Sequence, residues 1–90
     1  MIRHLWGMDR MWEGLIGGLD DSWRSGARAI AEDDFDDGFP GGSATAALAE
    51  TLHEQATRAE RAPRSARPAA YAEMIKACAG CHALTGAGVD

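Results

Sequence analysis

Two thiols and an imidazole lie within five residues near the end of this 90-residue chain, in the stretch CAGCH from Cys78 to His82. The chain has only these two cysteines. On a helix, Cys78, Cys81 and His82 stand at positions i, i+3 and i+4, so their side chains project from the same side. The reactive groups of the chain are therefore predicted to gather on one side of one helix.

A haem needs this arrangement of side chains. Two thiols can add to the two vinyl groups of a haem as thioethers, while the imidazole of the next residue reaches the iron, and CxxCH is the attachment signature of c-type haem. The pattern predicts one haem c, bound through Cys78 and Cys81, with His82 as the proximal iron ligand.

Three other kinds of site use the same residue types. A thioredoxin-like CxxC follows a strand and opens a helix, whereas this pair lies near the end of a predicted helix. A zinc site would combine both thiolates and His82 with His4 or His53, but a second closely spaced ligand pair is missing. Two buried structural cysteines beside an incidental histidine are the third alternative. We favour haem attachment over all three.

The composition predicts an all-α protein and excludes several function classes. Hydrophobic residues make up 46% of the chain and charged residues 26%, with only three prolines. The net charge of −5 and the scattered lysines and arginines argue against nucleic-acid binding. No apolar run approaches the roughly 20 residues of a membrane-spanning helix. No general acid, nucleophile or phosphate-binding loop is evident, so we do not expect an enzyme.

Four helices are expected, with short connections between them. Asp21 or Ser22 is predicted as the N-cap of the second helix and Ser43 as that of the third, while Pro68 suits the first turn of the fourth. An antiparallel up-down-up-down bundle is the natural arrangement of four such helices. We predict one haem-binding helical domain over residues 1–90, with helices at approximately 2–18, 22–34, 44–62 and 68–84.

The placement of CAGCH on the last of four helices resembles the four-helix-bundle monohaem c-type cytochromes, the cytochrome c prime family, in a small variant. The resemblance covers the whole chain in helix order, and CAGCH is its only specific motif. The stretch GLIGGLDDSWRSGARAIAED also looks like the first helix-to-helix turn of the smaller proteins of this family. The resemblance implies a bundle that encloses one covalently attached haem in the bacterial periplasm or at an extracellular surface, with the export signal absent from this sequence.

The sixth iron ligand is expected from the first helix. In an up-down-up-down bundle the first and last helices are antiparallel neighbours, so His82 is predicted to lie level with the opening turns of the first helix. His4 is the favoured distal ligand, and Met8 is the alternative. If Leu5 lies over the iron instead, the sixth position is open and can bind small gases.

The apolar stripes of the first and last helices are predicted to face inward and to wall the cofactor. Ile16 and Leu19 continue the inward stripe of the first helix. Trp6 is expected over a haem edge or at a contact with another subunit. Besides the three residues of the motif and His4, the predicted pocket consists of Leu5, Met8, Met11, Trp12, Tyr71, Met74 and Ile75.

Charged and polar residues away from the motif receive simpler interpretations. His53 is expected to face solvent, because it follows the inward Leu52 by about 100° around the helix. The acidic run from Glu32 to Asp37 is expected to be a solvated loop. One arginine is expected to pair with the haem propionates, and the candidates are Arg3, Arg10 and Arg67.

The function predicted from these features is single-electron transfer with redox proteins as partners. Two alternatives are a gas-binding protein with an open or labile sixth site and a haem-containing subunit of an oligomer or filament. Exposed tryptophans keep a homo-oligomer among the expectations.

Overall fold

The computed structural model describes residues 2–33 and 42–85, and within these ranges the chain is helical and contains no strand. The helices are α1 (Ile2–Gly17), α2 (Asp20–Glu32), α3 (Gly42–Glu60) and α4 (Arg67–Thr85), with a short 3-10 helix, η1 (Arg64–Ala66), before α4. None of the helices in these ranges is both long enough and apolar enough to cross a bilayer. The predicted all-α class is confirmed for the described residues.

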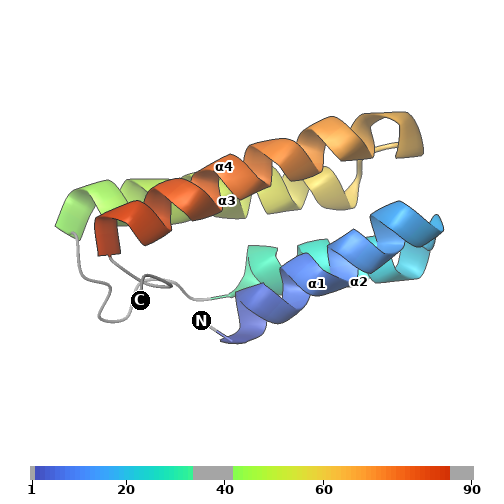
Figure 1. Ribbon diagram of the computed structural model, residues 1–90, viewed down its shortest axis with the longest axis horizontal. Helices are drawn as coiled ribbons and strands as arrows, with labels where there is room; N and C mark the ends of the chain where they lie inside the picture. The colour runs from blue at the N-terminus through green and yellow to red at the C-terminus, as the bar shows by residue number, and fades with distance from the viewer. Residues whose placement is uncertain (1, 34–41, 86–90) are drawn as a thin grey trace.

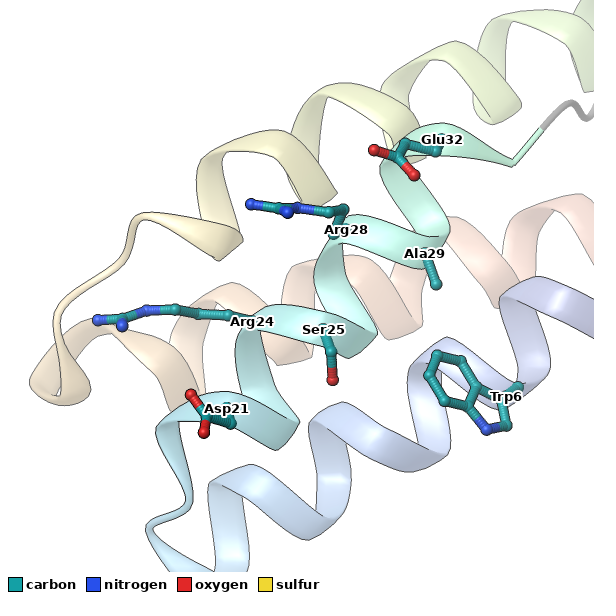
Figure 2. Close-up of a pocket in the computed structure, with 7 residues that line it drawn as sticks. All are labelled: Trp6, Asp21, Arg24, Ser25, Arg28, Ala29 and Glu32. Atoms are coloured by element: carbon teal, nitrogen blue, oxygen red, sulfur yellow. The ribbon is translucent and has the colours of Figure 1, made fainter.

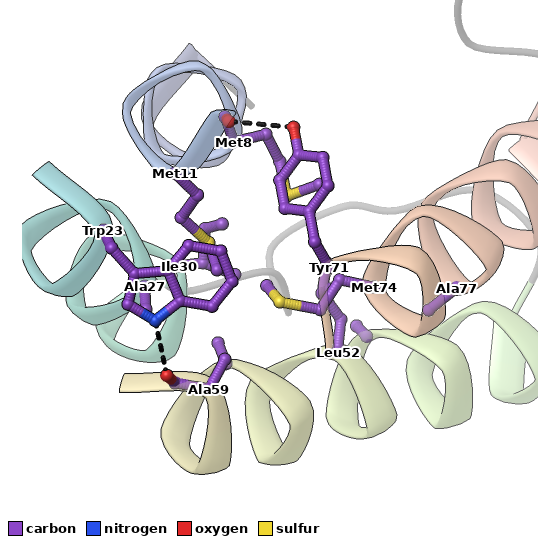
Figure 3. Close-up of a cluster of buried hydrophobic side chains, with 12 residues drawn as sticks. Met8, Met11, Trp23, Ala27, Ile30, Leu52, Ala59, Tyr71, Met74 and Ala77 are labelled. Carbon is purple, nitrogen blue, oxygen red and sulfur yellow. Dashed lines mark hydrogen bonds between the residues drawn. The ribbon is translucent and has the colours of Figure 1, made fainter. Parts of the chain in front are cut away.

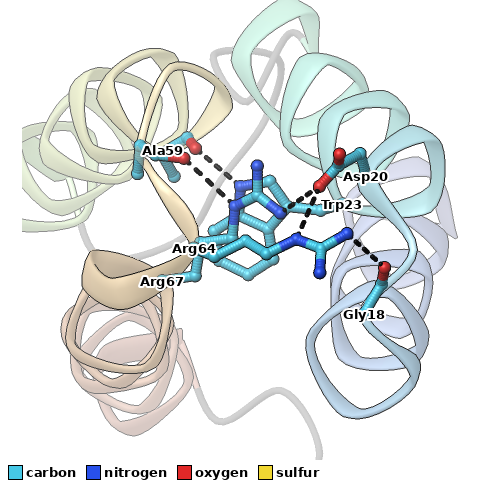
Figure 4. Close-up of polar contacts among 7 residues, drawn as sticks. Gly18, Asp20, Trp23, Ala59, Arg64 and Arg67 are labelled. Carbon is cyan, nitrogen blue, oxygen red and sulfur yellow. Dashed lines mark hydrogen bonds and ion pairs between the residues drawn. The ribbon is translucent and has the colours of Figure 1, made fainter.

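The helices run up, down, up and down, with α1 and α2 as one antiparallel pair and α3 and α4 as the other (Figure 1). Viewed end on, they occupy four corners in chain order (Figure 4). α1 packs along α2, α2 along α3, and α3 along α4. α1 and α4, which complete the ring, touch at only a few positions. The predicted small helical bundle is present, and its loosest edge lies between α1 and α4.

The predicted helix boundaries lie within two residues of the observed ones. The predicted N-cap of α2 is wrong, because the helix begins earlier, at Asp20, with Leu19 as its N-cap and no side-chain capping hydrogen bond. Asp20 and Asp21 occupy the first turn of α2, where carboxylates interact favourably with the helix dipole. Gly18, with φ of +66°, reverses the chain in a left-handed conformation that suits glycine, so the turn needs no capping side chain.

Glycines bring α1 and α2 into close contact. A Cβ atom added to Gly7 would lie 2.6 Å from Cγ1 of Ile30 and 2.7 Å from the carbonyl oxygen of Gly26. Gly14 packs in the same way against the backbone of Trp23. Real Cβ atoms do not approach other atoms so closely, so any larger residue at these positions would force the helices apart. α1 is thereby held against α2 along much of its length.

The bundle core contains large side chains from α1, α2 and α4, which pack against the small residues of α3 (Figure 3). Full burial of a large apolar side chain contributes roughly 1.5 to 3 kcal/mol. α3 supplies mainly alanines, so bulky partners can lie close to its backbone. The largest fully buried side chains are Met11, Trp23, Ile30 and Met74.

The end of the bundle that holds the α1–α2 and α3–α4 connections, here called the turn end, is closed by a polar network (Figure 4). The indole N–H of Trp23 donates to the carbonyl oxygen of Ala59 at 2.7 Å. Arg67, only 4% exposed, places its guanidinium 5.5 Å from the centre of the Trp23 ring. Arg67 also donates to the carbonyl oxygen of Ala62 at 3.1 Å and to Asp20 at 2.7 Å. The buried polar groups of this network therefore have partners.

Arg64 completes the turn end with hydrogen bonds to Asp20 at 3.3 Å and to the carbonyl oxygen of Gly18 at 2.9 Å. The hydrogen bonds from Arg67 and Arg64 hold the pKa of Asp20 below its ordinary value. Because Arg67 is committed to this network, at the opposite end of α4 from CAGCH, the prediction that it is a candidate partner for haem propionates is wrong.

Several apolar side chains that were predicted to face inward are exposed. The inward stripe of α1 was drawn from its large apolar residues, but the side of α1 that packs most closely is the glycine side, at Gly7 and Gly14. Met8 and Met11 of that stripe are buried in the core, whereas several of the other large side chains lie toward the loose α1–α4 edge or toward solvent. Those that are exposed are Leu5, Trp12 and Ile16 of α1, Leu19 in the α1–α2 connection, and Ile75 of α4.

Candidate cofactor site at the cysteine end

The last turns of α4 carry Cys78, Cys81 and His82, and we call this end of the bundle the cysteine end. α4 stays helical to Thr85, so the three side chains lie on neighbouring turns of one helix. Both cysteines are free of a disulfide, and all three side chains are partly buried. Cys78 packs against the hydrophobic core.

Gly80, inside the motif, faces α3. A Cβ atom added there would lie 3.3 Å from Cδ1 of Leu48. At about 100° per residue, Gly80 is roughly opposite Cys78 and His82 around the helix. The contact with α3 therefore turns the thiol of Cys78 and the imidazole of His82 away from α3.

Burial raises the pKa of both thiols, and the charge of Cys81 raises the pKa of Cys78 further. A redox-active dithiol needs the opposite, a thiolate stabilised by a helix N-terminus or a nearby cation. Cys78 and Cys81 lie instead in the last turns of α4, where the helix dipole disfavours negative charge. The thiol environment therefore does not support thioredoxin-like chemistry.

The register between α1 and α4 is set by Tyr71, whose hydroxyl donates to the carbonyl oxygen of Met8 at 3.0 Å (Figure 3). At 1.5 Å per residue, His4 lies about 6 Å from Met8 and His82 about 16 Å from Tyr71, in the same direction along the bundle. Measured along the bundle axis, His82 therefore lies about 10 Å farther than His4 from the turn end. The prediction that His82 is level with the opening turns of α1 is wrong, because Ile75 occupies that level.

His4 and His82 nevertheless lean toward each other. Side chains on a helix tilt toward its N-terminus, and α1 and α4 are antiparallel, so the tilt shortens the distance between the two rings. Burial lowers the pKa of His4, and the charge of His82 lowers it further. The rings are therefore closer together along the bundle than the backbones of the two residues.

Asp33 also lies at this end of the bundle, and the sequence analysis gave it no role in the site. Its carboxylate oxygen Oδ2 lies 3.6 Å from Nδ1 of His4, and the two side chains are only 11% and 9% exposed. The expectation of a solvated loop is therefore wrong for Asp33, while Asp34 to Asp37 lie outside the described residues. A signal was present in the sequence, since Asp33 follows the inward Ile30 by three residues and so continues the inner face of α2.

The other predicted pocket residues divide into two groups. Met8, Met11, Tyr71 and Met74 are buried in the core, farther from the cysteine end than His4. Leu5, Trp12 and Ile75 are exposed at or near the α1–α4 edge, where the Trp12 ring lies 6.1 Å from the Tyr71 ring. Of these residues, Leu5 and Ile75 are the apolar side chains nearest in register to His4.

Trp6 lies on the outer face of the α1–α2 pair. It lines a surface groove of about 480 Å³ with side chains of α2 (Figure 2), and the Arg10 guanidinium lies 5.7 Å from its ring centre. Arg10 also pairs with Glu13 at 3.3 Å. Trp6 therefore packs beside α2 and does not lie over the cysteine-bearing turns of α4. The other residues of the groove are Asp21, Arg24, Ser25, Arg28, Ala29 and Glu32.

The structure gives little support to the zinc alternative. His53, expected to face solvent, is half-buried on α3 with its Nε2 atom fully covered, so that expectation is wrong. Among residues 2–33 and 42–85, no three side chains of His, Cys, Asp or Glu are grouped closely enough to hold a metal ion.

No family model, no curated protein and no solved structure matches this chain. The resemblance to bundle cytochromes therefore depends on CAGCH and the order of the helices. The chemistry of the cysteine end has to be inferred from its own residues.

Proposed function

We propose that this protein is a monohaem c-type cytochrome that transfers single electrons between redox proteins. Cys78 and Cys81 hold the haem, His82 is the proximal iron ligand, and His4 is the distal ligand. The observation that supports the proposal is that four possible donors lie toward one end of the bundle: two unbridged thiols and the imidazole that follows them on α4, and a second, buried imidazole on α1.

The surroundings of these donors fit a large, flat, mostly apolar group. The α1–α4 edge is the loosest contact in the bundle, and it leaves Leu5 62% and Ile75 48% exposed. A haem placed along this edge removes their apolar surface from water, which contributes roughly 25 cal/mol for each Å² covered. Such a cofactor would account for the exposure of these two side chains in the polypeptide alone.

The residues of the chain would supply the thiols for attachment and the ligands of the iron. Each thiol adds its sulfur to one carbon of a vinyl group and its hydrogen to the other, so the reaction needs reduced thiols and no oxidant. When bound, the haem supplies an iron that accepts one electron and releases it again. With His82 and His4 both bound to the iron, no position would be left for a small ligand, which would favour electron transfer.

His4 is a better distal ligand than Met8 for a geometric reason. Met8 lies about 6 Å farther than His4 from the cysteine end, and its side chain is part of the packed core. His4 lies on the turn of α1 that is closer to His82. Under this proposal the protein acts in the periplasm or at an extracellular surface, and it is not an enzyme.

A second candidate function is gas binding at an open sixth position. The offset of about 10 Å between His82 and His4 along the bundle favours this alternative. If His4 does not reach the iron, the exposed Leu5 lies nearest to the open side. The two functions differ in whether carbon monoxide binds readily to the reduced protein.

The test is to produce the chain with an export signal in a bacterium that attaches c-type haem. The mass of the purified protein is then measured by mass spectrometry. We expect the mass of the polypeptide plus one haem. The double variant Cys78→Ser/Cys81→Ser should have the bare polypeptide mass, and a His53→Gln control should keep the haem. Wild-type protein with the bare mass, or with zinc in place of iron, would refute the proposal.

Optical spectra of the same protein separate the two functions. A reduced low-spin spectrum that carbon monoxide does not change supports electron transfer with His4 bound, and ready carbon monoxide binding supports the alternative. His4→Ala should convert the first behaviour into the second. An unchanged low-spin spectrum in His4→Ala would exclude His4 as the distal ligand.

A further inference from the structure

The pairing of His4 with Asp33 joins the start of α1 to the end of α2 beside the thiols. His4 and Asp33 are both nearly covered, and their Nδ1 and Oδ2 atoms are 3.6 Å apart. Hydrogen bonds between nitrogen and oxygen average about 3.0 Å, so a small rotation of either side chain makes the bond. A nearly buried carboxylate beside a nearly buried imidazole is costly unless the two groups stabilise each other.

The backbone fixes both members of this pair. Asp33 is the C-cap residue of α2, and its backbone N–H donates to the carbonyl oxygen of Ile30 at 3.2 Å. His4 lies three residues before Gly7, which packs directly against Ile30. One helix contact, Gly7 on Ile30, therefore sets the position of His4 relative to Asp33.

A carboxylate at Nδ1 determines what the other ring nitrogen can do. When Asp33 accepts the Nδ1–H, the neutral ring has its lone pair on Nε2, the form that binds a metal. Histidines that bind metals commonly donate their second nitrogen to a carboxylate, which orients the ring and makes it a stronger donor. A stronger imidazole donor stabilises Fe(III) relative to Fe(II), so it lowers the reduction potential.

We propose that Asp33 is a positioning residue that holds His4 through Nδ1 and presents Nε2 to the haem iron. This inference rests on the proposed function, because it needs the haem and His4 as its distal ligand. Asp33 would not contact the haem, and it acts only through His4. It extends the iron site from α4 and α1 to the end of α2.

The test uses the haem-loaded protein and compares Asp33→Asn with Asp21→Asn. Asp21 is an exposed residue of the same helix, so its variant makes the same change of charge without touching His4. Asp33→Asn should raise the reduction potential and speed carbon monoxide binding to the reduced protein, and Asp21→Asn should change neither. Asp33→Glu, which restores the carboxylate, should recover most of the wild-type potential.

A second measurement covers the case in which Asp33→Asn does not fold. In the reduced, diamagnetic wild-type protein, NMR should show a His4 Nδ1–H that exchanges slowly with solvent. A His4 ring protonated at Nε2 would overturn the inference. A folded, haem-loaded Asp33→Asn protein with wild-type potential and carbon monoxide kinetics would also overturn it.

The failures of the two proposals are distinguishable. If the wild-type protein carries no covalent haem, both proposals fall. If the haem is present and only the Asp33 results are negative, the proposed function stands and the role of Asp33 is refuted.

Discussion

The two ends of the bundle treat their polar groups in opposite ways. At the turn end, the buried Trp23 and Arg67 each donate to a backbone carbonyl, and Arg67 also pairs with Asp20. At the cysteine end, Cys78 and Cys81 keep raised pKa values and form no disulfide, and His4 has a lowered pKa. One end uses its polar groups to hold the helices together, while burial at the other favours the uncharged forms of its two thiols and of His4.

This difference assigns stability and chemistry to different ends. A satisfied buried network stabilises a fold and tolerates little change, because an unpaired buried donor or acceptor costs about 1 to 3 kcal/mol. A neutral imidazole keeps a lone pair that can bind a metal, and thiols that form no disulfide remain available for covalent attachment. The turn end therefore anchors the four helices, and the loose α1–α4 edge leaves room at the other end.

Trp23→Ala should produce the largest loss of stability. It removes the largest fully buried side chain, its hydrogen bond to Ala59 and its contact with Arg67, and loss of a buried tryptophan costs about 3 to 5 kcal/mol. Urea unfolding of the purified protein measures this. The matched control is Trp12→Ala, because Trp12 is 52% exposed and should cost far less. Equal losses of unfolding free energy in both variants would contradict the view that the turn end anchors the fold.

Gly7→Ala should produce the next largest effect. Its added methyl group would lie 2.6 Å from Ile30, so α1 must move away from α2 at a cost of about 1 to 3 kcal/mol. The movement also separates His4 from Asp33, so we expect a raised reduction potential. Gly17→Ala is the control, since the new methyl group would meet only its neighbour Leu19, at 3.3 Å. An unchanged unfolding midpoint in Gly7→Ala would show that the close contact is not needed.

The two ends should lose stability in different pH ranges. Burial lowers the pKa of His4 below 6.5, so the unfolded chain takes up a proton before the folded chain does, and stability falls as the pH drops below about 6.5. The pKa of Asp20 is held below 3.8 by its arginine partners, and its contribution is lost only as the pH falls below about 4.

Urea midpoints of the haem-free Cys78→Ser/Cys81→Ser variant between pH 7.5 and 3 can separate these two ranges. Adding His4→Gln should flatten the part just below pH 6.5 and leave the acid part intact. Adding Asp20→Asn should do the reverse. If His4→Gln leaves the upper range unchanged, His4 is not the group that titrates there.

Ile75→Ser should have the smallest effect on the polypeptide fold. Ile75 is 48% exposed, so the haem-free Cys78→Ser/Cys81→Ser variant should tolerate the substitution with little change in urea midpoint. The haem-loaded protein should be destabilised more, because the proposed cofactor covers this side chain. Equal small changes in both forms would indicate that Ile75 lies outside the cofactor site.

The local features were predictable from residues close together in the chain. Trp23 and Ile30 are seven residues apart and so share one face of α2, where both are fully buried. The spacing within CAGCH places two thiols and an imidazole on one helix, and α4 is a helix through that stretch. These properties follow from helical periodicity, which requires no knowledge of neighbouring helices.

The missed features all depend on partners distant in sequence. Gly26 has a low helix propensity, but in the folded chain it allows close contact between α2 and Gly7 of α1. Arg67 was a candidate for the cofactor, but it pairs with Asp20, 47 residues away. Asp33 was assigned to a loop, but it lies beside His4. Periodicity cannot show which of several arginines or acids meets a given partner.

The sequence by itself determined that this chain is helical and that two thiols and an imidazole share one helical surface, because 3.6 residues make one turn of any helix. Only the tertiary structure decided which helix edge is loose, how far His82 lies from His4, and that Asp33 accompanies His4. Those facts depend on the distance between packed helices, and in this protein three glycines set that distance for α1 and α2.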